Sequence, residues 1–183
     1  MNKIQRLLGS YSRFIAVPWR VDAAALQRVI FCVYDEREEL LLRAKVDEFE
    51  LATSQAGHGW ALFDLTDIFP EWLSSQRYAK SYFANPELLS TLLPKFLDYI
   101  DQRFESFIQE NPADGNVVVA LIGVGSLFGF VKVKDVVDRI APKVKGRLMV
   151  FFPGSYEDNN YRLLDRYDGW NYLAVPITAD KEL

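Results

Sequence analysis

The chain is poor in the side chains that most often carry out chemistry. Its 183 residues include one cysteine, Cys32, and one histidine, His58. A single cysteine cannot form an internal disulfide, and Cys32 lies in an apolar run where a small buried side chain is expected. These two residues also fall short of the four ligands of a structural zinc site. The sequence therefore favours a reducing compartment, and we expect neither a metal nor a cofactor.

Long hydrophobic runs are missing as well. No apolar segment approaches the roughly 18 residues that cross a bilayer. The first residues carry neither a continuous apolar stretch nor a small-residue cleavage site, so no secretory signal is predicted. Half of the residues are nevertheless hydrophobic and 14% are aromatic, which excludes general disorder. We expect a cytoplasmic protein with a substantial core and no membrane partner.

Neither sign of charge dominates the chain. The net charge is −4, which argues against a surface devoted to nucleic acid. Residues 132–147 hold six basic side chains against two acidic ones, whereas residues 35–50 hold seven acidic against three basic. The two stretches are either solvated helix faces or a dipole that steers a partner. Direct nucleic-acid binding through residues 132–147 is a weaker alternative, which strong salt dependence would reveal.

Hydrophobic periodicity predicts one domain over residues 1–183. An amphipathic helix is expected over residues 1–17, and a helical insertion over about 66–110 that Pro94 must kink or split. Strands are expected at 28–34, 60–65, 117–122, 147–152 and 171–177. Helices between strands make the strands parallel. The predicted fold class is a three-layer α/β domain with a mainly parallel sheet of about five strands. It is nucleotide-binding-like but lacks a Walker phosphate loop.

Three predicted strands are followed by residues that could form a ligand site. They are Asp35, the turn Gly123-Val124-Gly125-Ser126, and Pro153-Gly154. In open α/β sheets, ligands bind beyond the carboxyl ends of the strands, so these loops are expected to converge. Glycines after a strand let backbone amides face an anion, but their spacing matches neither a Walker loop nor a dinucleotide fingerprint. A nucleotide or anion site and a purely structural tight turn both remain open.

No recognisable catalytic constellation is present. Ser126 lacks the glycines at 124 and 128 that a nucleophile elbow needs, and no third residue is suggested to orient His58 as its base. Four acids at strand ends could gather a hard cation, although such acids more often cap helices: Asp35, Asp64, Glu157 and Asp158. We therefore predict a protein that is not an enzyme.

The last third of the chain carries an arginine and an aromatic cluster that suit binding. The planar fork of Arg162 could pair with a neighbouring acid such as Asp165 or Asp168, or face an anionic partner. Tyrosine and tryptophan are frequent at interface hot spots. An irregular, aromatic segment here is either a docking surface or a cover over the edge of the core. Its aromatic residues are Tyr156, Tyr161, Tyr167, Trp170 and Tyr172.

Several motifs resemble the BrxB family of bacteriophage-exclusion (BREX) systems. The specific ones are Leu121–Phe130 (LIGVGSLFGF), Leu148–Tyr156 (LMVFFPGSY) and Tyr161–Leu164 (YRLL). Their order and spacing also match, as do the overall length and the closing Asn171–Ala174. The resemblance is looser over the first part of the chain.

This resemblance implies an accessory protein of bacterial antiphage defence without catalytic residues. It also implies a place in an assembly with other BREX components, a PglZ-type, phosphatase-like protein being the first expected partner. One alternative stays open: a protein that binds a small molecule or nucleotide through the strand-end loops, with or without enzymatic activity.

Overall fold

The computed structural model describes residues 1–170 and 173–180. Its α-helices are α1 (Lys3–Ile15), α2 (Glu39–Gln55), α3 (Ile68–Ser74), α4 (Ala79–Ala84), α5 (Leu93–Glu110) and α6 (Val133–Ile140). Its strands are β1 (Val29–Tyr34), β2 (Gly59–Asp64), β3 (Val117–Ile122), β4 (Arg147–Glu157), β5 (Asn160–Leu163), β6 (Arg166–Trp170) and β7 (Val175–Ile177). Short 3-10 turns include η2 (Glu36–Glu38), η3 (Pro86–Thr91) and η4 (Val124–Leu127).

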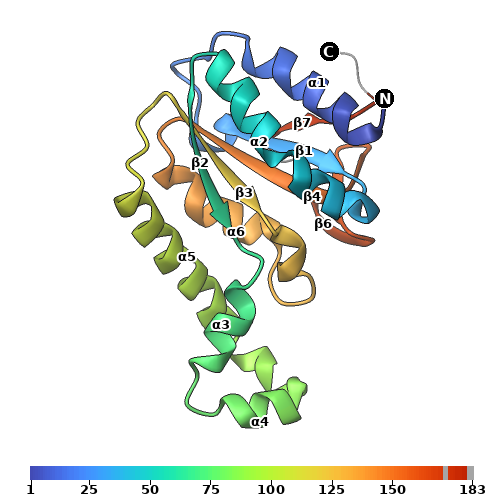
Figure 1. Cartoon of the computed structure of the whole chain (residues 1–183). Coiled ribbons are helices and arrows are strands. Elements are labelled where there is room, and N and C mark those ends of the chain that lie inside the picture. The colour runs from blue at the N-terminus through green and yellow to red at the C-terminus, as the bar shows by residue number, and fades with distance from the viewer. Residues whose placement is uncertain (171–172, 181–183) are drawn as a thin grey trace.

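The strands form one mixed sheet (Figure 1). Its main path runs β2-β3-β4-β1-β7, with parallel neighbours, and β5 and β6 extend it through antiparallel pairing with β4. The predicted α/β class is confirmed, but the sheet has seven strands. The prediction of about five missed the hairpin that follows β4.

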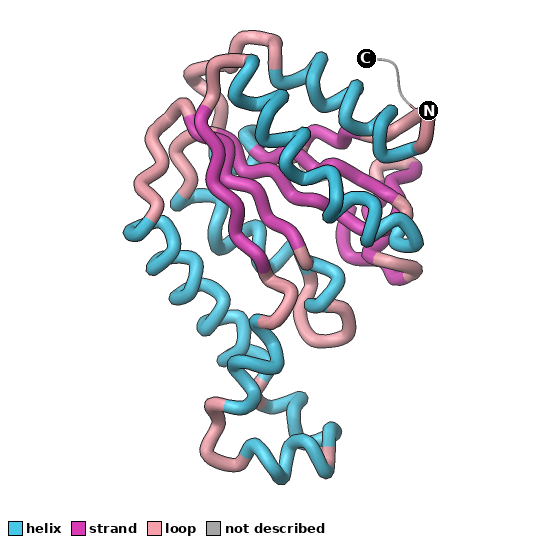
Figure 2. Tube along the Cα trace, viewed as in Figure 1, coloured by secondary structure: helices cyan, strands magenta, loops and turns pink. Residues whose placement is uncertain are grey.

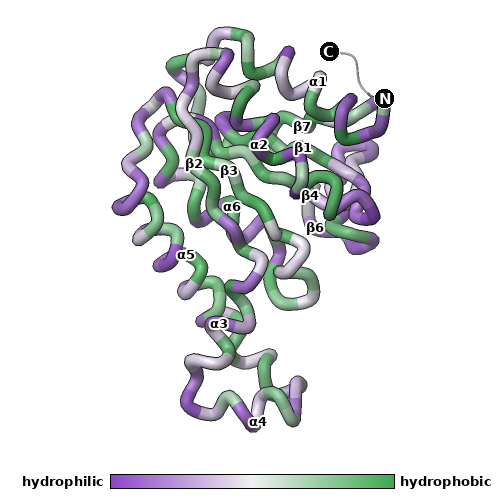
Figure 3. The backbone as a smooth tube through the Cα atoms, in the orientation of Figure 1, coloured by the Kyte–Doolittle hydropathy of each residue, from purple (hydrophilic) through white to green (hydrophobic). Residues whose placement is uncertain are grey.

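Helices cover both faces of the sheet and create two cores. α1 and α2 lie on one face, while α5 and α6 lie on the other (Figures 1 and 2). Successive strand residues alternate between the cores: Phe31 belongs to the α5–α6 side, and its neighbours Ile30 and Cys32 belong to the α1–α2 side. Figure 3 shows the central strands β1, β3 and the first half of β4 as mainly hydrophobic. A strand buried on both faces is expected to be apolar throughout.

Local sequence explains several helix boundaries. Asn2 caps α1 through a reciprocal pair of hydrogen bonds with Gln5. α6 buries a stripe of four aliphatic residues and ends at Ile140, before a short 3-10 turn that contains Pro142. Pro94 lies in the first turn of α5, where a missing amide hydrogen costs nothing. The insertion is therefore split there into separate helices, one of the two outcomes expected.

The main departures follow Phe152. β4 continues to Glu157 and turns back through Asp158 and Asn159, both with left-handed backbone angles (φ 50° and 63°), into β5. The segment predicted to be irregular is therefore a β-meander of β4, β5 and β6. In the last predicted strand, β7 spans Val175–Ile177, and residues 171 and 172 lie outside the described residues.

α4 and η3 form a lobe that extends away from the sheet (Figure 1). α4 buries none of its residues. Tyr78, Phe83 and Leu88 are 56%, 60% and 47% exposed, although their side chains are large and apolar. We call residues 76–92 the lobe below.

Candidate functional site

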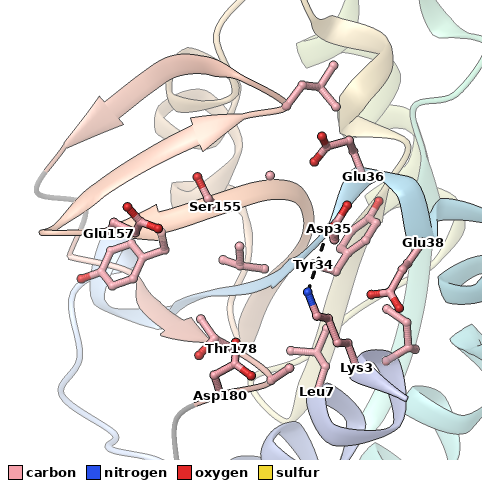
Figure 4. A pocket seen from close by; sticks show the side chains of 16 residues that line it. Lys3, Leu7, Tyr34, Asp35, Glu36, Glu38, Ser155, Glu157, Thr178 and Asp180 are labelled. Carbon is pink, nitrogen blue, oxygen red and sulfur yellow. Dashed lines mark ion pairs between the residues drawn. The ribbon is translucent and has the colours of Figure 1, made fainter.

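A cavity of about 560 Å³ lies at the carboxyl ends of β1 and β4. Its walls come from the first turns of α1, the residues after β1, the outer half of β4, and residues 178–180 (Figure 4). Asp35 and Gly154, two of the predicted strand-end residues, both line it. Three strand-end loops were predicted to converge. Two of them meet at this cavity, whereas the turn Gly123-Val124-Gly125-Ser126 does not line it.

The cavity is acidic. Five carboxylates line it, against the single ammonium group of Lys3: Asp35, Glu36, Glu38, Glu157 and Asp180. The Asp35 carboxylate lies 2.5 Å from the Arg37 guanidinium and 4.0 Å from Lys3. Hydrogen bonds from Arg37 hold the pKa of Asp35 well below its usual range. Asp35 also accepts the backbone N–H of Arg37 and so caps η2, which is the role that acids at strand ends usually have. Such a lining repels phosphate.

The Phe-Phe-Pro-Gly motif marks the point where β4 leaves the parallel sheet. Up to Pro153 the strand pairs with β1, and from Gly154 onward it pairs with β5. The Pro153 carbonyl accepts the backbone N–H of Leu164 at 2.8 Å. A Cβ on Gly154 would lie 1.9 Å from the carbonyl oxygen of Arg162. Glycine is required here because two backbones meet at van der Waals contact.

The Gly-Val-Gly-Ser turn is built for close packing. Gly123 has a φ of +82°, and a Cβ there would lie 2.5 Å from the Thr66 hydroxyl and 2.9 Å from the Asp64 carboxylate. The backbone N–H of Ser126 already donates to the Gly123 carbonyl at 3.0 Å, and η4 is only four residues long. Because the Ser126 amide is already hydrogen-bonded and the Asp64 carboxylate lies beside the turn, this turn is poorly suited to bind an anion. The geometry favours the tight structural turn, and no part of this turn lines the cavity as the described residues form it.

A polar network at the same edge of the sheet escaped sequence reasoning. Arg43 of α2 donates to Glu39 at 2.8 Å and to the Thr66 hydroxyl at 2.7 Å. Glu39 also accepts a hydrogen bond from Tyr34, and burial raises the pKa of that phenol. The i,i+4 spacing of Glu39 and Arg43 was a visible signal. Its long-range partners were not visible, because they come from β1 and from the loop after β2.

His58 and Ser126 lie at opposite ends of the neighbouring strands β2 and β3. His58 immediately precedes β2 and Ser126 follows β3, and these two strands are parallel neighbours. His58 stacks on Trp19 with ring centroids 3.7 Å apart, and its Nδ1 lies 2.6 Å from the Asn116 side-chain oxygen. The length of a strand, at about 3.3 Å per residue, separates the histidine from the serine. Among the described residues, no cluster of three or more His, Cys, Asp or Glu side chains is arranged to hold a metal ion.

A family model described as the BREX protein BrxB matches residues 61–177. That range is more than half of the 183 residues. The chain belongs to the BrxB family. No curated protein and no solved structure matches it. The match runs from β2 to β7, so α1, β1 and α2 lie outside it. The acidic cavity of this BrxB-family protein is thus built partly from residues beyond the match.

The aromatic residues predicted to form an interface in the last third of the chain differ in how exposed they are. Tyr161 is 1% exposed and packs edge-on against Phe31 at 4.7 Å, so it belongs to the core. Tyr156 is half-buried, and its hydroxyl donates to the side chain of Asn159. Tyr167 is 45% exposed. The side chain of Trp170 and all of Tyr172 lie outside the described residues.

Arg162 lies on the exposed side of β5. It pairs across the strands with Ser155 and forms no ion pair with a residue that the structure describes. Asp168, one of the acids considered as its partner, instead accepts the backbone N–H groups of Val133 and Lys134 at 2.8 and 3.0 Å. A residue of β6 therefore caps the N-terminus of α6.

A second concave region, of about 700 Å³, lies between α5 and β6. We call it the α5–β6 groove. Its apolar wall comes from the first turns of α5 and from the loop before α6, chiefly Leu93, Leu97, Phe128, Phe130 and Val131. Lys132, Arg166 and Tyr167 are exposed at its margin. Every lining residue lies within the range that matches BrxB.

Three of the six basic side chains at residues 132–147 are paired with acids among the described residues. Arg139 contacts Asp98 at 2.7 Å, and Lys143 contacts Asp101 at 2.7 Å, so α6 is paired to α5. Lys134 pairs with Asp138 along α6 itself. This arrangement disfavours a nucleic-acid surface on α6. None of the helices that the structure describes is both long enough and apolar enough to cross a bilayer.

Proposed function

We propose that this chain is a non-catalytic adaptor of a BREX antiphage-defence complex in the cytoplasm, and that it acts through protein–protein contacts. Family membership supports the BREX setting. The partner we propose is a PglZ-type protein, which the resemblance to BrxB implies.

One observation carries the adaptor role: the lobe exposes large apolar side chains. Tyr78, Phe83 and Leu88 are each about half exposed or more. A six-residue helix without a fully buried residue gains little stability from its own fold. Large exposed apolar side chains on a projecting element suit a protein interaction site. The lobe therefore supports docking to another protein.

Direct binding tests this proposal. The purified chain and the PglZ-type protein of the same BREX system are mixed and titrated by calorimetry. We expect a stable complex, and we expect Tyr78→Ser with Phe83→Ser to weaken it by about tenfold or more, since buried aromatic anchors dominate interface energies. Leu40→Ser, at an 83% exposed leucine of α2, is the matched control and should leave the affinity unchanged. Equal affinities for the lobe variant and the control would contradict the role of the lobe.

A second candidate function is ligand binding in the strand-end cavity. Its volume falls in the range of about 300–1,000 Å³ that ligand sites occupy, and an α/β sheet of the nucleotide-binding type would place a ligand there. The carboxylates favour cations over nucleotides. A thermal-shift screen of divalent cations, polyamines and nucleotides separates the candidates, because a ligand at 100 times its Kd adds about 2.7 kcal/mol of stability.

A further inference from the structure

We infer that the α5–β6 groove binds a short amphipathic segment of the partner protein, with apolar side chains inside the groove and carboxylates at its basic margin. The inference rests on the proposed adaptor function and specifies where and how it acts. The groove and the lobe are continuous, because Ser90 at the end of η3 and Leu93 and Pro94 at the start of α5 line the groove.

The floor of the groove is apolar and firmly held. Phe130 stacks on Phe69 with ring centroids 3.7 Å apart, and Leu163 beneath the groove is 3% exposed. Leu97, Phe128 and Val131 are only partly buried although they adjoin the core. A preformed apolar surface with partly exposed side chains gains free energy when an apolar side chain displaces water from it.

The margin of the groove supplies the charge that selects the partner. Lys132 and Arg166 are exposed, and neither forms an ion pair with a described residue. Arg166 is held over the ring of Phe128 at 5.2 Å, with its guanidinium near the groove. Arg139 of α6 and Lys143 of the turn that follows it are neutralised by acids of α5. Lys132 and Arg166 therefore give the groove margin two cations without an acidic partner among the described residues.

The acids of the groove do not neutralise the positive charges of Lys132 and Arg166. Asp168 is 4% exposed, and its two carboxylate oxygens are bound to the α6 amides. Asp138 compensates Lys134. Asp135 is the remaining exposed carboxylate among the described lining residues, against the two free cations. An acidic apolar segment is therefore the complementary ligand, and a basic segment is disfavoured.

The inference is tested with the purified PglZ-type protein as the probe. Lys132→Glu with Arg166→Glu reverses the margin without touching the core, and Leu97→Ser makes the floor polar. We expect each variant to lose roughly tenfold or more in affinity by calorimetry, with the loss from charge reversal shrinking as salt is raised. Lys145→Glu is the matched control, because Lys145 is exposed, basic and outside the groove. Its affinity should stay within about twofold of the parent.

Each result decides a different point. If the parent chain binds and the groove variants bind equally well, the groove inference is overturned while the adaptor function stands. If the parent chain does not bind the PglZ-type protein, both fail. Sedimentation equilibrium of the chain alone tests the other occupant: a parent dimer that the charge reversal converts to monomer would place a second copy in the groove and overturn the partner assignment.

Discussion

The strand-end cavity and the α5–β6 groove are of similar size but opposite character. The cavity of about 560 Å³ is lined by five carboxylates and draws partly on α1 and β1, outside the BrxB match. The groove of about 700 Å³ has an apolar floor and a basic margin, and it lies wholly inside the match. The cavity occupies the place where α/β proteins bind small ligands. The groove has the composition of a protein-docking site. Position in the fold therefore selects the cavity as the binding site, whereas chemical character selects the groove.

The two regions share one wall, the β4–β5–β6 meander. Gly154 to Glu157 and Leu164 face the cavity, while Leu163 and Arg166 to Asp168 face the groove. A change that displaces the meander should therefore disturb both regions, and a change on one side of it should disturb only one.

The largest effect is expected from Gly154→Ala. The added Cβ would lie 1.9 Å from the carbonyl oxygen of Arg162, so the β4–β5 pairing must open. We expect a loss of roughly 3 kcal/mol or more in the free energy of unfolding, measured by urea denaturation, together with weaker binding of the PglZ-type protein. Gly115→Ala, where a Cβ meets nothing within 4 Å, is the control and should be close to neutral. A stable Gly154→Ala variant would show that the meander does not need this backbone contact.

Asp168→Ala should separate the two regions. It removes the cap from α6 and leaves two amides of its first turn, one buried and one partly buried, without their acceptor. We expect about 1–2 kcal/mol of destabilisation. Because α6 begins at the groove, binding of the PglZ-type protein should also weaken. Asp165→Ala, at an exposed acid of the same meander, should have little effect on either measurement. Equal stability of the two variants would contradict the capping role.

The smallest effect is expected from Asp35→Asn, on the cavity side. Hydrogen bonds from Arg37 lower the pKa of Asp35 in the folded state, so its contribution is present at neutral pH and is lost as the pH falls below about 4, the value in unfolded chains. Because the Arg37 partner is exposed, the contribution should be only about 0.5 kcal/mol. Unfolding at pH 7 should distinguish the variant from the parent, and unfolding near pH 3 should show a smaller difference. A gap that grows on acidification would contradict this sign.

Elements with strong local signals could be predicted from the sequence. β3 matches its predicted limits, and α6 buries the aliphatic residues that its periodicity selects. The β5–β6 hairpin was missed because its strands are short and polar, with few β-branched residues. Asp158-Asn159 was a readable clue, since these two residue types tolerate positive φ in hairpin turns.

The candidate sites could be predicted only in part. Asp35 and Gly154 were placed together because parallel strands bring their carboxyl ends to one edge. The Asp168 cap joins residues about 35 positions apart, and the groove draws on three separate segments of the chain. No local pattern encodes such pairings, so the groove appears only once the chain is folded.

The strand order also sets a constraint on the order of synthesis. β1 lies between β4 and β7, which both come from the last 40 residues of the sequence. A ribosome therefore releases the apolar strand Val29–Tyr34 long before either neighbour exists to pair with it. Until then its edges remain open to other chains. This protein should consequently complete its sheet late, and shortened products that end before β4 should aggregate rather than persist as folded fragments.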